Sequence, residues 1–156
     1  MKLKFLTILV LLVVMSSCGG DKAKQEVAKE PENKEVAKTK ELEKIDPMKD
    51  KGVGPIKSIT LGEIDNALAE KGKGIFKTKC TACHKINKRF VGPALKGVTK
   101  KQTPEWIMNM ILNPEVMVVE NAKARELLME FSAPMANQNL TEEEARAVLE
   151  YFRTKN

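Results

Sequence analysis

The sequence predicts a small all-α domain in its C-terminal part, preceded by a signal segment and a flexible linker. Three observations predict this. Segments with apolar residues at three- and four-residue steps recur after residue 60, and alternating runs of β-branched residues are scarce. The chain also has only five Phe, one Tyr and one Trp in 156 residues. Seven aromatic residues are few for a core made of protein alone, so we expect a group other than protein to complete the core.

The first 17 residues are predicted to be a signal peptide. Two lysines precede the apolar stretch 5–15, which is too short to span a bilayer of about 30 Å. The sequence that follows, MSSCGG at residues 15–20, resembles the lipobox of bacterial lipoproteins. This resemblance implies that Cys18 carries a lipid, which anchors the chain on the periplasmic side of a bacterial membrane. An ordinary signal peptide with an incidental cysteine is the alternative.

Residues 18–53 are predicted to be a flexible linker, and residues 54–156 the folded domain. Lys, Glu and Ala dominate the linker, its acids and bases balance, and it has no aromatic residue. Such a segment cannot bury enough apolar surface to offset the entropy lost on ordering. We therefore expect a tether, since about 35 residues of flexible coil have an r.m.s. reach of roughly 30 Å.

Four helices are predicted within the domain. The first follows a capping-box pattern at 60–63 and continues toward Lys79. The second is PEWIMNMIL, with Thr103 as its N-cap and Pro104 at its first position. It should end before Pro114, because the residue before a proline disfavours the helical conformation.

The third predicted helix is ENAKARELLMEF at 120–131, and the fourth follows a second capping box at 141–144. The buried face of the fourth helix is expected to consist of Ala145, Val148, Leu149 and Phe152. Between the first two helices, the segment 84–102 contains two glycines and a proline, which predicts a long irregular loop. A loop of this length in a compact domain usually wraps a ligand or has a function of its own.

The segment CTACH, Cys80 to His84, holds two of the three cysteines and the only histidine. A structural zinc site needs four tetrahedral ligands, and a thioredoxin-like dithiol needs a strand–helix context, so both fit poorly. Covalent haem attachment uses every residue, since the thiols of Cys80 and Cys83 bond to two vinyl groups and His84 ligates the iron. We therefore expect one covalent haem c. Because the chain has no second histidine, the distal ligand must be methionine, lysine or nothing.

Three segments, KGKGIFKTKCTACH, VGPALKGV and APMANQNLTEEEARAVLEYF, resemble those of the class I monohaem cytochromes c, and the resemblance covers residues 62–156. It implies a small helical domain wrapped around the haem. It also implies that the Pro93 carbonyl accepts the His84 Nδ1 proton and that Leu95 packs on the haem. Finally, it implies that Met135 is the distal ligand.

The resemblance also implies one packing contact, and the sequence departs from the family's pattern at one position. In the family, an aromatic residue near the end of the last helix packs beside a small residue of the first helix. Here that pair would be Tyr151 or Phe152 against Gly72. The departure is that the family more often has proline after the ligand methionine, whereas here proline precedes Met135.

Met135 has competitors for the distal position. It follows Ala133 and Pro134 in an irregular stretch, where a side chain can be aimed into a pocket. Four other methionines follow His84, of which Met108 and Met110 lie in a predicted helix and are more typical of core packing, while Met117 and Met129 are conceivable ligands. An open or lysine-bound site is the remaining alternative. Trp106 is also assigned to the haem environment, as a donor to a haem propionate or, preferably, as a core residue in contact with the haem.

His/Met ligation leaves the iron no free site, so the predicted function is one-electron transfer by a protein that is not an enzyme. Residues 77–101 hold eight Lys and Arg and no acid, which predicts a positive ring for acidic docking faces of redox proteins, such as a quinol-oxidising complex and a terminal oxidase or reductase. The whole chain carries only +6, too mild an excess for a nucleic-acid binder. The alternatives are a fixed haem subunit of a larger respiratory complex and a sensor or peroxidase-like protein with an open distal site.

Overall fold

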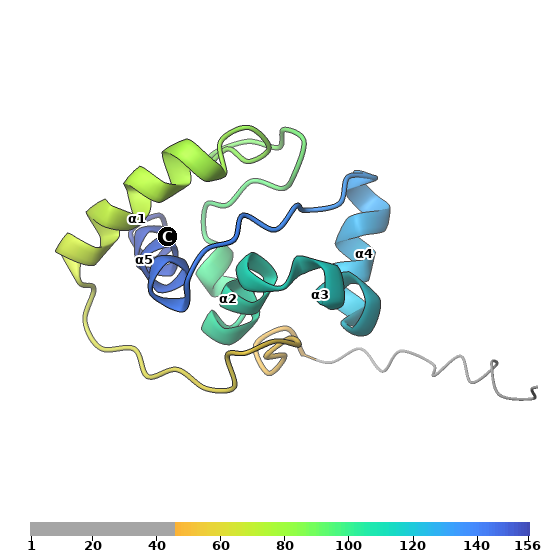
Figure 1. Ribbon diagram of the computed structural model, residues 1–156, viewed down its shortest axis with the longest axis horizontal. Coiled ribbons are helices and arrows are strands. Elements are labelled where there is room, and N and C mark those ends of the chain that lie inside the picture. The colour runs from red at the N-terminus through yellow and green to blue at the C-terminus, as the bar shows by residue number, and fades with distance from the viewer. Residues whose placement is uncertain (1–45) are drawn as a thin grey trace, which may run out of the picture. The chain divides into compact units, whose positions relative to one another are not determined.

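The structure, a computed structural model, describes residues 46–156. The predicted signal peptide, Cys18 and the linker as far as residue 45 lie outside the described residues. The described part contains α-helices and one short 3₁₀-helix but no β-strand, which confirms the all-α class (Figure 1). None of its helices is long and apolar enough to cross a membrane.

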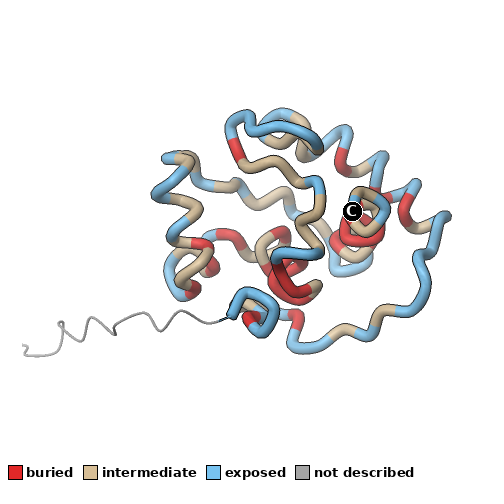
Figure 2. The backbone as a smooth tube through the Cα atoms, turned by 180° about the vertical axis from the view of Figure 1, so that it is seen from behind, coloured by how far each residue is buried: buried red, intermediate tan, exposed pale blue. Residues whose placement is uncertain are grey.

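The elements along the chain are α1 (Asn66–Lys79), η1 (Val98–Lys100), α2 (Pro104–Leu112), α3 (Pro114–Glu120), α4 (Ala122–Phe131) and α5 (Glu142–Arg153). After the loop that ends at residue 97, the connections as far as α4 are short, whereas the irregular segment 132–141 separates α4 from α5. Figure 1 shows α1 packed against α5, with α2, α3 and α4 continuing away from this pair. Buried positions, red in Figure 2, are most frequent in α2 and α5.

The start of α1 differs from the prediction. The helix begins at Asn66, and the carboxylate of Asp65 caps it by accepting a hydrogen bond from the Leu68 N–H at 2.9 Å. The predicted capping box at 60–63 is therefore wrong, because those residues are not helical. This segment is instead held by α5, where the Arg153 guanidinium donates to the Gly62 carbonyl at 2.6 Å.

The second predicted helix is confirmed as α2, with Thr103 Oγ1 accepting from the Trp106 N–H at 3.1 Å. The helix α3 was not predicted, because Pro114 was interpreted only as the end of α2. Proline is also well suited to the first position of a helix, where its missing N–H has no partner to lose. In the structure Asn113 both ends α2 and precedes α3.

The last helix, α5, follows its prediction closely. The Thr141 N–H donates to the Glu144 carboxylate at 2.9 Å, and the Glu144 N–H donates to Thr141 Oγ1 at 3.2 Å, so both bonds of the capping box are present. The four residues expected on its inner face are all buried. Glu150 is buried as well, and it is paired with the guanidinium groups of Arg146 and Arg153.

The contact between α1 and α5 depends on Gly72. A Cβ atom at this position would lie 1.9 Å from the carbonyl oxygen of Ala147, so only glycine allows the two backbones to approach so closely. The predicted packing of Tyr151 or Phe152 beside Gly72 stays a prediction. The rings of both residues pack against Phe76 of α1, with centroid distances of 5.5 and 5.7 Å.

Residues 50–59 pack against the side of α2 and are called here the N-terminal strap. Asn109 of α2 holds the strap at two points, since its Oδ1 accepts from the Ile56 N–H and its Nδ2 donates to the carbonyls of Lys51 and Ile56, all at 2.9 Å. Asp50 is buried at the start of the strap. Among the described residues, packing against the domain begins at Asp50, four residues before the predicted start of the folded domain at residue 54.

Candidate functional site

The site is built around a turn at the C-terminal end of α1. Cys80 caps α1 by donating its N–H to the Phe76 carbonyl at 3.0 Å. The N–H groups of Cys83 and His84 then both donate to the Cys80 carbonyl, at 3.1 and 2.9 Å. This turn brings the two thiols and the imidazole together at one helix end.

Both thiols are free rather than joined in a disulfide. Cys80 is half-buried and Cys83 is exposed. Burial, with a smaller contribution from Cys83, raises the pKa of the Cys80 thiol to about 11. A redox dithiol depends on a lowered thiol pKa, so this environment argues against that alternative.

The imidazole of His84 is held in one orientation by the loop that follows it. Its Nδ1 lies 3.1 Å from the carbonyl oxygen of Pro93, which is the contact expected from the resemblance. Because a carbonyl can only accept, Nδ1 carries the proton of the neutral ring and Nε2 keeps its lone pair. Burial lowers the pKa of His84, while the hydrogen bond to Pro93 opposes the shift. The neutral ring, with Nε2 free, is the form that ligates a metal.

Gly92 lets the backbone pass against the face of this imidazole. A Cβ atom at Gly92 would lie 2.6 Å from Cε1 and 2.9 Å from Nδ1 of His84. The Gly92 N–H donates to the Cys83 carbonyl at 2.9 Å, which closes the loop back onto the turn. Sequence reasoning quoted Gly92 only as part of the loop and missed its role beside the ring.

The predicted irregular loop is confirmed, apart from the short η1 within it. Two backbone hydrogen bonds fold it onto itself, from Leu95 N–H to the Lys85 carbonyl at 3.1 Å and from Lys96 N–H to the Ile86 carbonyl at 2.8 Å. Leu95 is half-buried and packs against the core. Its predicted contact with the haem stays a prediction.

Met135 lies in the irregular segment that Figure 1 shows crossing the molecule from the end of α4 to the start of α5. Its side chain is half-buried and packs against the core. The segment begins at Ser132, which ends α4 in the left-handed conformation with φ 51°. Further along, the Asn137 side-chain amide donates to the Leu112 carbonyl at 3.2 Å.

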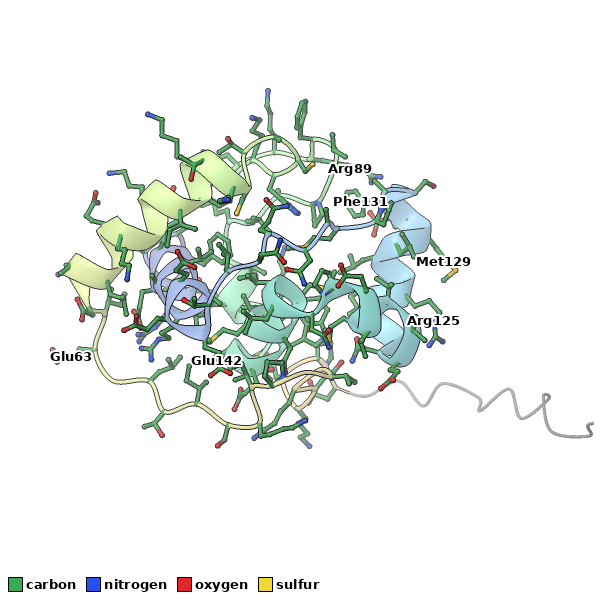
Figure 3. All side chains as sticks on the ribbon, viewed as in Figure 1. Glu63, Arg89, Arg125, Met129, Phe131 and Glu142 are labelled. Atoms are coloured by element: carbon green, nitrogen blue, oxygen red, sulfur yellow. The ribbon has the colours of Figure 1, made fainter. Side chains whose placement is uncertain are left out.

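The other methionines fit a ligand role less well. Met117 is fully buried, and its sulfur accepts the Val53 N–H at 3.0 Å, so the strap already occupies it. Met129 is 69% exposed and projects outward from α4 in Figure 3. Met108 is buried within α2, and Met110 is half-buried in the same helix.

Trp106 is committed to the core. Its indole Nε1 donates to Asn121 Oδ1 at 3.1 Å, and the Asn121 amide nitrogen lies 2.8 Å from the Asp50 carboxylate. An engaged N–H argues against a hydrogen bond to a haem propionate, and the contact of Trp106 with the haem stays a prediction. Sequence reasoning missed this network, since Asp50 and Asn121 are 71 residues apart.

The positive ring predicted from residues 77–101 is only partly free. Its members are Lys77, Lys79, Lys85, Lys88, Arg89, Lys96, Lys100 and Lys101, called here the basic group. Six of its lysines and Arg89 are exposed, whereas Lys85 is half-buried and donates to the Thr81 carbonyl at 2.7 Å. Arg89 pairs with Glu130 of α4 at 3.0 Å, a contact that the sequence analysis did not foresee.

Comparisons with known proteins agree with this geometry. Residues 69–155 match the family model described as Cytochrome c. A cytochrome c from Rhodothermus marinus has a similar structure, with a TM-score of 0.64 and 48% identity over 65% of this chain and 88% of that chain. An engineered form of it, Rma TDE, gives a TM-score of 0.63 and 47% identity over 65% of this chain and 89% of that chain. Cytochrome c-551 of Stutzerimonas stutzeri is 53% identical over 36 residues, which are 22% of this chain and 35% of that protein.

Proposed function

Because the chain belongs to the cytochrome c family, with one covalently bound haem c, we propose that it carries single electrons between redox partners. The observation that carries this proposal is the geometry at residues 80–93. There, two free thiols on one turn lie next to an imidazole whose Nδ1 is held by a backbone carbonyl.

The residues fit the cofactor that the family implies. Cys80 and Cys83 would form the two thioether bonds, and His84 would ligate the iron through Nε2. Met135 would supply the distal sulfur, since it is half-buried in an irregular segment and the sulfur of Met117 is already engaged. The bound haem supplies a one-electron iron couple, and His/Met ligation favours its reduced form.

The chain's own role is then to hold these groups still. The Pro93 carbonyl fixes the rotation of the His84 ring, and the backbone at Gly92 lies close against the ring. Because His84 and Met135 would both ligate the iron, no open site would remain for a substrate, and electron transfer would be the chemistry left. A fixed ligand geometry keeps the rearrangement between oxidation states small.

We also propose that the protein is tethered through a lipid on Cys18 to the periplasmic side of a bacterial membrane. The support is the lipobox-like sequence at residues 15–20. In both Figures 1 and 2, residues 46–50 lie on the side of α2 and α3, away from the turn 80–84. The site would therefore face away from the point of tethering.

The partners proposed for this carrier have acidic docking faces, such as those of a quinol-oxidising complex and a terminal oxidase or reductase. The support is the basic group, which has no acidic residue within its stretch of sequence. Charges of this kind raise the rate of encounter more than the affinity. Raising the ionic strength should therefore slow electron exchange with an acidic partner.

The test is a spectrum of the full chain matured in a cell competent for cytochrome c assembly. We expect haem that stays bound under denaturing conditions, a far-red methionine–iron band in the oxidised protein, and no rapid carbon monoxide binding after reduction. Met135→Ala should remove the band and allow carbon monoxide to bind. Colourless protein with two free thiols, or rapid binding by the unaltered protein, would overturn the proposal.

A further inference from the structure

Arg89 connects the loop after His84 to the end of α4. Its NH1 lies 3.0 Å from Glu130 Oε1, and its NH2 donates to the Glu130 backbone carbonyl at 3.1 Å. The guanidinium also lies over the Phe131 ring, 4.0 Å from the centroid, and Figure 3 shows the two side chains together where the loop meets α4. One side chain therefore makes three contacts with two consecutive residues.

These contacts join the two chain segments that carry the proposed iron ligands. Arg89 follows His84 by five residues, and Phe131 precedes Met135 by four. Among the described residues, no other hydrogen bond joins the loop 85–92 to the segment 130–140. Arg89 is thus the direct polar connection between the two parts of the chain that carry the proposed ligands.

The segment that carries Met135 has few other restraints. Within residues 46–156, none of the backbone N–H groups of residues 133–136 donates a hydrogen bond. The nearest bond to another element is the one from Asn137 to the Leu112 carbonyl. A segment held this weakly opens easily, so the attachment at its start affects how firmly Met135 is presented.

We propose that Arg89 is a positioning residue that keeps Met135 on the iron by holding the end of α4 against the loop of His84. This inference rests on the proposed function, in which His84 and Met135 are the axial ligands. The side chains of Arg89 and Glu130 are 58% and 49% exposed, so the ion pair alone contributes little. The planar fork on carboxylate and carbonyl, together with the stack on Phe131, makes arginine difficult to replace with lysine.

The experiment measures how easily the distal ligand is displaced from the full, haem-loaded chain. Imidazole is titrated into the oxidised protein, and its apparent affinity and the loss of the far-red methionine–iron band are recorded. We expect Arg89→Ala to bind imidazole roughly fivefold more tightly than wild type, and Arg89→Lys roughly twofold. Glu130→Gln should fall between wild type and Arg89→Ala, since it keeps the carbonyl contact and the stack.

Arg125→Ala is the matched control. Arg125 is also an arginine at α4, and its guanidinium donates to the Val119 carbonyl, at the far end of the helix from Arg89. Its replacement should leave imidazole binding unchanged. Helical circular dichroism of all variants checks that an altered affinity does not come from unfolding.

The outcomes separate this inference from the proposed function. If Met135→Ala keeps the far-red band, Met135 is not the ligand, and the proposed ligation falls together with the role of Arg89. If Met135→Ala loses the band but Arg89→Ala binds imidazole like Arg125→Ala, the role of Arg89 is wrong while the proposed function stands. If both Arg89 variants bind imidazole more tightly than wild type, and the same Arg89 substitutions have no effect on imidazole binding in the Met135→Ala background, the inference is supported.

Discussion

At the scale of single residues, Gly92 determines how closely the backbone approaches the proposed proximal ligand. A methyl group at this position would lie 2.6 Å from Cε1 of His84, so either the ring or the loop has to move. We expect Gly92→Ala to lower the free energy of unfolding by roughly 2 kcal/mol and to weaken the bond between His84 and Pro93. Chemical denaturation of the haem-loaded protein measures the first effect, and the electronic spectrum of the oxidised protein reports the second.

Gly62→Ala is the control for the loss of a glycine outside the site, because a Cβ at Gly62 meets nothing within 4 Å. It should change the free energy of unfolding by less than about 1 kcal/mol. If Gly92→Ala had the spectrum and the free energy of unfolding of wild type, the close packing of this loop against His84 would not be needed to hold the ligand.

The residues of the site differ in how far the sequence could predict them. Cys80, Cys83 and His84 lie within five positions, so their spacing was enough to indicate a haem. Met135 was chosen as the distal ligand among the five methionines that follow His84. The observation that argues against Met117 as a ligand is the hydrogen bond that its sulfur accepts from Val53, 64 residues away. A contact at such a separation leaves no periodic or compositional pattern in the sequence, and the same is true of the Arg89 contacts.

At the scale of secondary-structure elements, the α1–α5 contact depends on one glycine. A Cβ at Gly72 would lie 1.9 Å from the Ala147 carbonyl and 2.8 Å from the Val148 nitrogen, and backbone atoms cannot rotate away as a side chain can. Gly72→Ala should therefore force the two helices apart and reduce the free energy of unfolding by roughly 3 kcal/mol. The measurement is the denaturant midpoint of the haem-loaded protein.

Gly74 provides the matched control in the same helix. A Cβ at Gly74 meets nothing within 4 Å, so Gly74→Ala exchanges a poor helix former for a good one at no steric cost. It should raise the free energy of unfolding by up to about 1 kcal/mol. Equal effects of the two substitutions would contradict the assignment of Gly72 as the contact point.

The strap is the second element with a testable basis. Asn109 is 1% exposed and makes three hydrogen bonds to the backbone of the strap. Asn109→Ala would leave those buried groups without partners, and we expect a loss of roughly 3 kcal/mol and faster proteolysis within residues 50–59. Asn87, which is exposed and makes no side-chain hydrogen bond within residues 46–156, is the control, and Asn87→Ala should have no such effect.

The helices were predictable where residues next to a helix end form a recognisable capping pattern. Thr103 with Pro104, and Thr141 with Glu144, are local signals, and the helices that they start were found. Residues 50–53 of the strap were assigned to the linker because the composition is polar up to residue 53, yet Asp50 and Lys51 make hydrogen bonds with distant side chains. The sequence of such a segment does not reveal which distant side chains form hydrogen bonds with its backbone.

At the scale of the whole molecule, the proposed carrier combines a redox site held by the folded domain with a linker that the sequence predicts to be flexible. Residues 46–50, which lead into the strap, lie on the side of α2 and α3 away from the turn 80–84 (Figure 1). With the linker attached there, the basic group would be free to meet a partner while the lipid stays in the membrane. The rate of delivery should then depend on linker length and the redox site should not.

Deleting residues 22–45 tests this dependence, because the deletion stops short of the strap and leaves every described contact in place. The shortened chain should show the same far-red band and the same free energy of unfolding as wild type. Electron delivery between membrane partners should nevertheless slow, since a short tether cannot span the distance between two docking faces. A Gly/Ser replacement of equal length is the control and should retain the wild-type rate. If membranes with the deleted form transferred electrons as fast as wild type, the domain would not move between partners, and a fixed subunit of a larger complex would describe it better.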